Sequence, residues 1–435
     1  MSLSDTRRTR REFLRTTAAA AVAAPYVLTS TALGAGGRPA AGERIVMGAI
    51  GVGGRGMGDM NAFLGSPEVQ MVAVCDVFED RRRRAKDTVD KRYGSADCTA
   101  YNDFREVVTR DDIDAVCIGT PDHWHVLHAL EAVRAGKDVY CEKPLGLSIE
   151  QGKALRAAVR RYGRVFQFGT QERSSGSTRQ AAEIVLNGWI GKVHTIKVGT
   201  RFSISSPNYP PMPVPDGLDY DLWLGPAPWA PYTANRVSNS HWFHISDYAL
   251  GFLAGCGIHT IDMAAWGNGT DRTGPVEVEG TGEFPRDGLC NCALAWNVDL
   301  RFANGVTMNF TDGNQNPLGV RFEGPDGWVF VKERHLGGTV DAEPKSLLRR
   351  TAGPDEIRLP VSNNHHQNFL ECIKSRQDPV APIEVAVRSD TLCQLSDIAT
   401  RLRRKLKWDP VKEEFVGDAE AARMMDRPMR EPWRI

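Results

Sequence analysis

The stretch "RIVMGAIGVGGRG", residues 44–56, decides the fold of this chain. Its first half is a short apolar run, which is typical of a buried β-strand. Its second half, "GVGGRG" (51–56), follows the pattern Gly-x-Gly-x-x-Gly with Gly51, Gly53 and Gly56. Glycines at these positions allow a tight turn and let the N-terminus of a helix approach a pyrophosphate. The stretch therefore predicts the first strand, turn and helix of a dinucleotide-binding domain.

A second apolar run, "VQMVAVCD" (69–76), supports this interpretation because it ends in Asp76. A carboxylate there can accept hydrogen bonds from the ribose diol of a dinucleotide. It also repels a 2′-phosphate, so NAD is the favoured cofactor and NADP the alternative. The basic run "RRRR" (81–84) could offset that repulsion, although a solvated helix face is the simpler interpretation. Gly54 and Arg55 are expected to line the same cofactor.

The rest of the first domain continues as apolar strands separated by amphipathic helices. The expected strands are residues 113–121, 137–144 and 164–171. Near-continuous apolar strands that alternate with helices predict a parallel, doubly wound sheet with right-handed crossovers. We therefore assign residues 44–165 to a Rossmann domain.

After this domain the periodicity changes to short strands separated by Gly, Asn and Asp turns, which predicts a large open sheet that is mostly antiparallel. The expected strands are 193–202, 276–284, 294–302, 306–313, 320–331 and 356–361. The fold class is α/β, with the C-terminal α/β domain at residues 166–410 and a tail at 411–435. Its final helices are expected to pack back on the Rossmann domain.

Residues 1–43 are interpreted as an export signal and linker. "TRREFLR" (9–15) carries the pair Arg10 and Arg11 ahead of an Ala-rich apolar run, as in twin-arginine signals; a disordered basic leader is the alternative. The run is too short for a stable membrane anchor. The signal predicts export of a folded protein to the periplasm or the extracellular space.

Composition excludes two classes of function. The 54 basic and 54 acidic side chains give a net charge of zero, which argues against a nucleic-acid-binding protein and against a polybasic membrane protein. The nine cysteines are odd in number, and Cys75, Cys117 and Cys141 lie in strand-like runs, so we expect reduced, buried thiols. No metal site is predicted, because the "CNC" at 290–292 is too tightly spaced for convincing metal ligation.

Several motifs together resemble the Gfo/Idh/MocA oxidoreductases, over roughly residues 44–410. The motifs are "GVGGRG" (51–56), "GTPDHWH" (119–125), "GKDVYCEKP" (136–144), "GCGIHTIDMAAW" (255–266), "DLWLGPAP" (221–228) and "KWDP" (407–410), the last two being typical of an exported bacterial branch. The resemblance implies a nicotinamide held between a Rossmann domain and a C-terminal open sheet. It also implies a homo-oligomer, a dimer or tetramer built through that sheet.

The lysine of the Glu-Lys-Pro motif lies beside the nicotinamide and the substrate hydroxyl in the family, and Lys143 matches it. The position is physically reasonable, because open parallel sheets bind ligands at the carboxyl ends of their strands. A neighbouring cationic ring and partial burial should lower the pKa of the lysine, so that it can accept a hydroxyl proton as hydride leaves. Glu142 is expected to hold Lys143, and Pro144 to fix the turn, with a cis bond as in relatives.

A second motif supplies His259 and Asp262, three residues apart and therefore on one helix face. The resemblance implies that His259 binds the reacting hydroxyl or relays its proton; a packing histidine is the alternative. The family's first Asp of this motif is Gly255 here, which removes a carboxylate that would orient sugar hydroxyls.

The remaining candidates line the cofactor or the substrate. Thr120, Pro121, His125 and Glu142 are expected at the nicotinamide, with His123 and Trp124 facing the ligand. Gln171, Arg173, His241, Trp242 and His244 are expected at a carbohydrate or polyol substrate, each with packing as the alternative. The pair His365 and His366 is interpreted as a helix cap.

Three functions remain open on the sequence. The first is an NAD(P)-dependent oxidoreductase that acts on the CH–OH group of a sugar or cyclitol. The second uses tightly bound, recycled NAD to oxidise a sugar transiently, so that a glycosidic bond is cleaved or a centre is inverted. The third is a non-catalytic sugar-binding protein, which the glycine at 255 motivates.

Overall fold

The computed structural model describes residues 39–435. Arg10, Arg11 and the rest of the expected export signal up to residue 38 lie outside the described residues. The chain divides into a unit Met1–Arg44, whose described part contains a single 3-10 turn at Ala41–Glu43, and a unit Ile45–Ile435. No helix within residues 39–435 is both long and apolar enough to cross a membrane.

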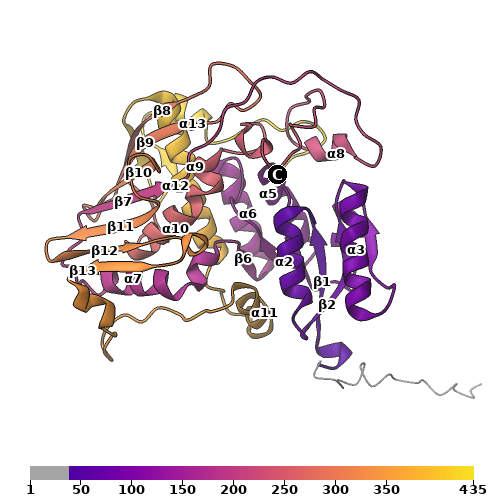
Figure 1. Cartoon of the computed structure of the whole chain (residues 1–435), viewed down its shortest axis with the longest axis horizontal. Helices are drawn as coiled ribbons and strands as arrows, with labels where there is room; N and C mark the ends of the chain where they lie inside the picture. The colour runs from indigo at the N-terminus through magenta and orange to yellow at the C-terminus, as the bar shows by residue number, and fades with distance from the viewer. Residues whose placement is uncertain (1–38) are drawn as a thin grey trace, which may run out of the picture. The chain divides into compact units, whose positions relative to one another are not determined.

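The second unit begins with a six-stranded parallel sheet in the order β3-β2-β1-β4-β5-β6 (Figure 1). The strands are β1 Ile45–Ile50, β2 Val69–Cys75, β3 Thr99–Tyr101, β4 Ala115–Ile118, β5 Asp138–Cys141 and β6 Phe166–Phe168. The order reverses between β1 and β4, and such a reversal forms the ligand crevice of a doubly wound sheet. The expected Rossmann fold is confirmed.

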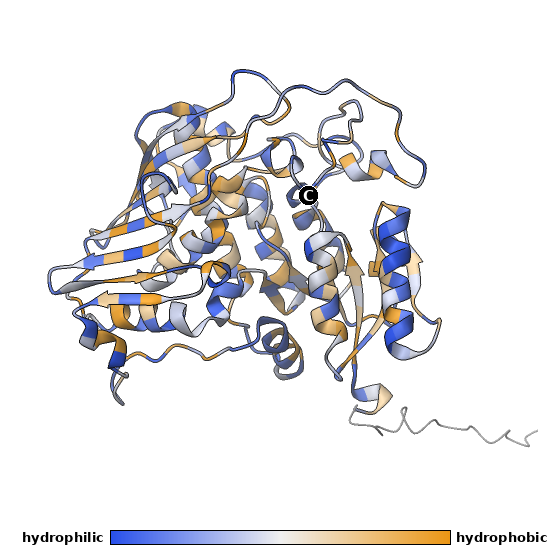
Figure 2. Ribbon diagram, viewed as in Figure 1, coloured by the Kyte–Doolittle hydropathy of each residue, from blue (hydrophilic) through white to orange (hydrophobic). Residues whose placement is uncertain are grey.

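Helices cover both faces of this sheet. They are α2 Gly54–Leu64, α3 Glu79–Tyr93, α4 Phe104–Val108, α5 Asp122–Arg134 and α6 Ile149–Tyr162. Helices α2 and α3 share one apolar core with the sheet, and α4, α5 and α6 share another. Figure 2 shows α3 as strongly hydrophilic, in contrast to the buried strands beside it. The short β3 and α4 were not expected from the sequence, because neither is long enough to show a period.

The second sheet has nine strands in the order β13-β12-β11-β7-β10-β9-β8-β14-β15. Its strands are β7 Thr195–Thr200, β8 Glu277–Glu283, β9 Ala295–Arg301, β10 Thr307–Asp312, β11 Gly319–Gly324, β12 Gly327–Val331, β13 Val340–Glu343, β14 Leu406–Asp409 and β15 Glu414–Phe415. Only the pair β7 and β10 is parallel, which confirms the expected mostly antiparallel sheet. Along β8 every second residue is buried, so one face of the sheet packs and the other is open.

Helices pack on the covered face of this sheet and connect it to the Rossmann domain (Figure 1). They are α7 Gly176–Leu186, the short α9 Phe252–Gly255, α10 Gly257–Gly267 and α12 Ile383–Leu402. Helix α12 contacts α6, α10 and β8, so it lies between the two sheets. Helix α11, His365–Ser375, packs with α2 in the core of the Rossmann domain.

Four expected boundaries need correction. Strand β6 pairs with β5, so the Rossmann sheet extends to residue 168 rather than 165. The run 320–331 forms two strands, because Pro325 and Asp326 interrupt it as a turn. Residues 356–361 form no strand, and "KWDP" does not simply end a helix but contains most of β14.

The tail at 411–435 is not a loose end. It contains β15 and the short helix α13, Ala419–Arg423, and then returns to the Rossmann domain, where Met425 accepts the amide of Glu150. Near its end, Trp433 packs edge-on against Trp124 with ring centroids 4.7 Å apart. The tail therefore belongs to the packed structure.

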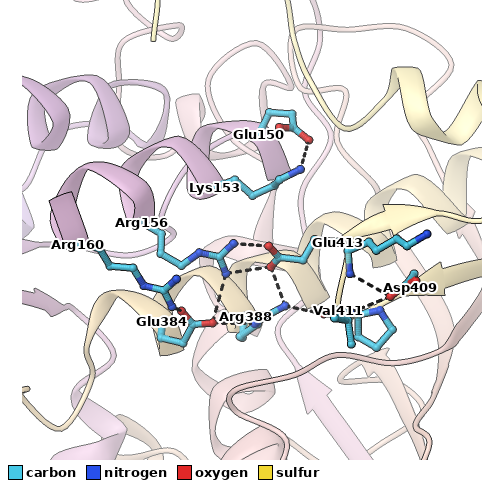
Figure 3. Close-up of polar contacts among 11 residues, drawn as sticks. Glu150, Lys153, Arg156, Arg160, Glu384, Arg388, Asp409, Val411 and Glu413 are labelled. Atoms are coloured by element: carbon cyan, nitrogen blue, oxygen red, sulfur yellow. Dashed lines mark hydrogen bonds and ion pairs between the residues drawn. The ribbon is translucent and has the colours of Figure 1, made fainter.

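A buried charge cluster joins α6, α12 and the start of this tail (Figure 3). The carboxylate of Glu413 lies 3.0 Å from Arg156 and 2.7 Å from Arg388, and Glu384 pairs with both arginines and with Arg160. Glu413 has a left-handed φ of 56°, which a non-glycine residue adopts only when its surroundings hold it. These ion pairs lower the pKa of Glu413 against the opposing effect of burial.

This cluster predicts that Glu413→Gln destabilises the protein by about 1–3 kcal/mol, because two nearly buried guanidinium groups lose one of their two charged partners and keep only Glu384. The control is Glu414→Gln, whose side chain is 55% exposed beside Lys412. Urea unfolding monitored by circular dichroism measures both variants. Because the folded pKa of Glu413 is lowered, its contribution is present above the unfolded pKa of about 4.3 and is lost as the pH falls. Equal midpoints for the two variants at neutral pH would contradict the prediction.

Candidate functional site

A cleft with about 1050 Å³ of empty space lies at the carboxyl ends of the Rossmann strands. The glycine loop between β1 and α2 forms one wall, and the β4–α5 and β5–α6 loops form the floor. Of the predicted cofactor residues, the lining includes Gly51, Gly53, Gly54, Arg55, Asp76, Thr120, Pro121, His125, Glu142 and Lys143. The structure thus brings ten of the predicted residues together, and Gly56 lies directly behind them.

The glycine loop has its composition for a steric reason. A Cβ on Gly56 would lie 1.8 Å from the carbonyl oxygen of Gly51, so only glycine allows α2 to begin so close to β1. Gly51 itself has a φ of 77°, and its Cβ would lie 2.5 Å from Thr120. By contrast, Gly53 and Gly54 border the cleft, where side chains would reduce the space at the start of α2. This cradle at a helix N-terminus fits the pyrophosphate of a dinucleotide.

Asp76 follows β2, next to the glycine loop, and two backbone amides hold its carboxylate. Its carboxylate accepts the amides of Val52 and Phe78 at 2.9 and 3.0 Å. Burial raises the pKa of Asp76, and the charge of Arg81 opposes that rise. Arg81 lines the cleft and stacks on Phe78, so the interpretation of residues 81–84 as a wholly solvated face is wrong for this residue.

Glu142 and Lys143 follow β5 and point to different partners. Glu142 is buried and accepts hydrogen bonds from Arg55 at 3.0 Å and from Gln171 at 2.8 Å. Although burial opposes ionisation, the nearby charges of Arg55 and Lys143 lower the pKa of Glu142 to about 2. Gln171, predicted at the substrate, therefore positions this carboxylate instead.

The Lys143 amine crosses the cleft floor to the second domain. Its Nζ donates a hydrogen bond to the Gly255 carbonyl oxygen at 2.7 Å, at the last residue of α9. The bond between Lys143 and Pro144 is cis, as expected. His125 links the neighbouring loops, because its two ring nitrogens contact the carbonyl oxygens of Pro144 at 2.6 Å and Thr120 at 2.8 Å.

His259 lies in the first turn of α10, next to this lysine. Burial and the charge of Lys143 hold the pKa of His259 well below its usual range, so the imidazole is neutral at physiological pH. Its Nδ1 is buried and has no hydrogen-bond partner in the part of the chain that is described. The amine and the imidazole thus share one environment, and the imidazole retains an unused nitrogen.

Asp262 and Arg173 do not reach the cleft. They form a two-pronged ion pair at 2.8 and 2.9 Å with side chains 0% and 3% exposed, and Ser389 donates to Asp262 as well. Two buried charges that satisfy each other are not available to a substrate. The predicted catalytic role of Asp262 and the predicted substrate contact of Arg173 are therefore replaced by a positioning role, in which the pair anchors α10 to the 3-10 turn Gln171–Ser174.

The long segment between β7 and α9 covers the cleft. From it, Leu222, Trp223, Val237, Asn239, Trp242 and Phe243 line the cofactor cleft directly. The segment is fixed to α5, because Trp124 donates to the Leu222 carbonyl at 3.1 Å and His123 contacts the Trp223 carbonyl at 3.0 Å. His123 therefore fixes the covering segment to α5. Trp124 does the same and also lines the cleft.

Other predicted histidines serve the packing. His241 contacts Tyr209 at 3.2 Å, and His244 is buried against Phe252, where burial lowers its pKa to about 4. Of the predicted substrate residues His241, Trp242 and His244, Trp242 is the one that lines the cleft. At the other predicted pair, Asn364 caps α11, while His365 contacts Ser174 and His366 contacts Asp59, so the capping interpretation is wrong.

Sequence reasoning missed Asp122. This residue follows Pro121 and lines the cleft, yet it is 1% exposed and neither carboxylate oxygen has a partner among residues 39–435. Burial raises its pKa well above the usual range. The motif "TPDHWH" contained the signal, but only the fold shows that the carboxyl is buried beside the cleft.

The cysteines of the chain are reduced, and Cys75 lines the cleft. All nine cysteines of the chain are free, and Cys75, Cys117 and Cys141 are buried as expected. Within the described residues no group of three or more His, Cys, Asp or Glu side chains could hold a metal ion.

The profile described as "Oxidoreductase family, NAD-binding Rossmann fold" matches residues 45–170, and the one described as "Oxidoreductase family, C-terminal alpha/beta domain" matches residues 183–435. Both profiles represent the Gfo/Idh/MocA proteins. The chain belongs to the Gfo/Idh/MocA oxidoreductase family. Its Rossmann domain is an NAD-binding domain, and the cleft described above fits that cofactor.

Two curated proteins are similar to part of this chain. A "Glycosyl hydrolase family 109 protein" from Saccharopolyspora erythraea is 37% identical over 159 residues, which are 33% of this chain and 34% of that protein. An "Alpha-N-acetylgalactosaminidase" from Shewanella oneidensis is 35% identical over 161 residues, 33% of this chain and 35% of that protein. The matched stretch thus spans about a third of each relative.

A solved structure has the same fold. The aldose-aldose oxidoreductase from Caulobacter crescentus, complexed with glycerol, aligns with a TM-score of 0.61 at 21% identity and covers 84% of this chain and 99% of that one.

The glycine geometry predicts that Gly56→Ala abolishes dinucleotide binding, because its Cβ would overlap the Gly51 carbonyl and open the turn. The control is Gly58→Ala in the same helix, where no atom lies within 4 Å of the new Cβ. Isothermal titration calorimetry with NAD measures both. Wild-type affinity in the Gly56 variant would contradict the assignment of this loop.

Proposed function

We propose that this protein is an NAD-dependent oxidoreductase that transfers hydride between the nicotinamide and a hydroxyl-bearing carbon of a sugar or cyclitol, with NADP as a less favoured cofactor. The observation that carries the proposal is the hydrogen bond from Lys143 Nζ to the Gly255 carbonyl. It ties an amine at the carboxyl end of β5 to the segment that leads into His259, beside the NAD-binding cleft.

The two groups suit a proton relay. NAD, when bound, supplies a hydride acceptor that can return the hydride later. His259 is neutral, so its unused ring nitrogen can accept the hydroxyl proton of a substrate. Lys143 can orient the same oxygen with its remaining N–H donors and exchange the proton with solvent, because its side chain is only partly buried. The buried carboxylate of Glu142, held by Arg55 and Gln171, keeps the lysine in position.

The sugar or cyclitol class is supported by the relatives, whose names refer to glycosyl hydrolysis and N-acetylgalactosaminidase activity, and by an aldose oxidoreductase of the same fold. The assignment to CH–OH groups follows from the pairing of a hydride acceptor with a proton relay.

A second form of the function is favoured by the cover of the cleft. Trp223, Trp242 and Phe243 lie over the cofactor site, and α5 and the C-terminal tail hold that segment down. A cofactor so enclosed should leave slowly. We infer that the enzyme could retain NAD and oxidise a sugar only transiently, so that cleavage of a glycosidic bond or epimerisation is the net reaction. The glycosyl hydrolase relatives fit this form.

Lys143→Met should abolish hydride transfer while NAD binding persists, because the substitution keeps the side-chain length and removes the amine. The loss should be about 10²–10⁴-fold, the usual contribution of a positioned proton-transfer group. The measurement is the absorbance of reduced nicotinamide in a single turnover across a panel of sugars and cyclitols. Lys153→Met, a partly exposed lysine paired with Glu150 on α6, is the control. An unaltered rate in the Lys143 variant would remove the relay.

Retention of the cofactor separates the two forms. Native mass spectrometry of freshly purified protein should detect one dinucleotide per chain in the second form. Arg430→Ala should lower that occupancy, because Arg430 binds the Asp221 side chain at 2.6 Å and the Gly225 carbonyl at 3.0 Å and so fastens the cover. Arg423→Ala, in α13 of the same tail, is the control. Cofactor lost from the wild type on gel filtration would favour simple dehydrogenation.

Two further expectations remain proposals. We propose that the Arg10–Arg11 leader exports the folded protein to the periplasm or beyond, which fractionation of a strain with both arginines changed to lysine tests. We also propose a homo-dimer or tetramer, which the same native mass spectra would report.

A further inference from the structure

A buried carboxyl group that the mechanism above does not use lies at one end of the second sheet. Glu333 follows β12, in the hairpin turn that leads to β13. Strand β11 pairs Val320 with Val331 of β12 and Gly319 with Gly199 of β7. The turn therefore lies at the same end of the sheet as the residue after β7, Arg201.

This end of the sheet is also where α10 begins. Helix α10 packs against β7 and β11, and its first turn carries His259. The Lys143 amine is bound two residues before α10, at the end of α9. The charges of Lys143 and His335, a neighbour of Glu333, both act on His259. The Glu333 turn and the proposed relay thus belong to one cluster.

The Glu333 side chain is buried with His335 of its own turn as its ionic neighbour. It is 1% exposed, and its Oε2 accepts no hydrogen bond in the described part of the chain, although His335 Nδ1 lies 3.1 Å away. The turn is held by other groups: the Glu333 carbonyl accepts the amides of Leu336 and Gly338, and Glu172 accepts the amide of Arg334 at 2.9 Å. The turn does not require the carboxyl.

The charged groups that act on Glu333 come from several parts of the site, and His335 comes from its own turn. Burial and the like charge of Glu172, from the turn before α7, raise the pKa of Glu333 to about 7 against the opposing charges of Arg201 and Lys143. Glu172 shows the same direction, because burial raises its pKa too. Burial lowers the pKa of His335, which lies beside Glu333. The charge of Glu333 contributes to the raised pKa of the Cys256 thiol. Glu333 is therefore partly protonated at neutral pH.

We propose that Glu333 is a third proton-transfer group of this site, an acid that protonates the oxygen of a leaving group when a glycosidic bond of the substrate is cleaved. The proposal rests on the second form of the proposed function. A dehydrogenase moves a single proton, for which Lys143 and His259 suffice, whereas cleavage by elimination requires a proton for the departing oxygen as well.

The steps balance without an external oxidant. Once a sugar carbon stands as a ketone, His259 takes the proton of the neighbouring carbon and the C–H electron pair forms a C=C bond. The C–O bond to the leaving group breaks, and that oxygen takes the Glu333 proton. Water then adds to the double bond: its oxygen bonds to the carbon that lost the leaving group, and its proton passes to the Glu333 carboxylate. His259 returns its proton to the neighbouring carbon. The hydride first removed then reduces the ketone, and its oxygen regains through Lys143 the proton that the hydroxyl first lost.

The test compares two leaving groups. Glu333→Gln should lower the cleavage of methyl glycosides by about 10²–10⁴-fold, because a methoxide needs a proton to leave. In a single turnover it should lower the release of p-nitrophenolate from p-nitrophenyl glycosides by less than about 10-fold, because nitrophenolate leaves unaided and its release precedes the addition of water. The matched control is Glu323→Gln on β11, where the carboxylate pairs with Arg321 and Lys197 at the open face. The melting temperature of each variant shows that it is folded, and its NAD content shows that the cofactor is bound.

Two further readouts separate a proton-transfer role from a structural one. Wild-type cleavage of methyl glycosides should fall as the pH rises through about 7, because the acid form is required. Glu172→Gln removes the neighbouring negative charge, so it should move that fall to lower pH. In D₂O, Glu333→Gln should still exchange deuterium into the carbon beside the transient ketone, since that exchange depends on His259.

The outcomes are distinguishable. Equal losses on both leaving groups, or no loss on either, would overturn the role of Glu333 while the deuterium exchange leaves the proposed function intact. If the wild type itself incorporates no deuterium and produces no reduced nicotinamide with any glycoside of the panel, the proposed function fails and the role of Glu333 fails with it.

Discussion

The site depends on one hydrogen bond between the two domains. The Lys143 amine follows β5 of the Rossmann sheet, and the Gly255 carbonyl ends α9 of the second domain. A lysine at the carboxyl end of a parallel strand would ordinarily extend into solvent. Here its donor is fixed by a backbone acceptor at the start of the helix that carries His259, so the cofactor cleft and the proposed relay share a boundary that either domain alone could not form.

Buried charge supports that bond. The Glu142 carboxylate accepts the backbone amide of Lys143 at 3.2 Å and is itself held by Arg55 and Gln171. Arg55 extends the chain of contacts to Asp59, which also contacts His366 on α11. Each charge in this network has a partner, which is the condition under which buried charges are tolerated. The same condition explains why Asp262 and Arg173 face each other rather than the substrate. In contrast, both carboxylate oxygens of Asp122, the Oε2 of Glu333 and the Nδ1 of His259 are buried without a hydrogen bond in the described part of the chain.

Much of the first domain was predictable because its signals are local. The glycine pattern, the apolar runs and Asp76 each follow from a short stretch of chain, and the structure has the corresponding strands, turn and helix in the expected order. The second sheet was predicted as a class, from its strand composition and turn residues. Its details were not: residues 356–361 are apolar enough for a strand but find no partner, and Pro325 divides a run that otherwise reads as one strand.

By itself the sequence determined the backbone chemistry of this protein: where glycine must replace a side chain, where strands run parallel, and which motifs place it near the Gfo/Idh/MocA proteins. Only the tertiary structure decided which polar side chains are free to react. Arg173 and Gln171 were indistinguishable from substrate ligands in the sequence, and Glu333 gave no signal at all. The physical reason is that the state of a charged group is set by its burial and its partners, and these come from segments up to hundreds of residues away.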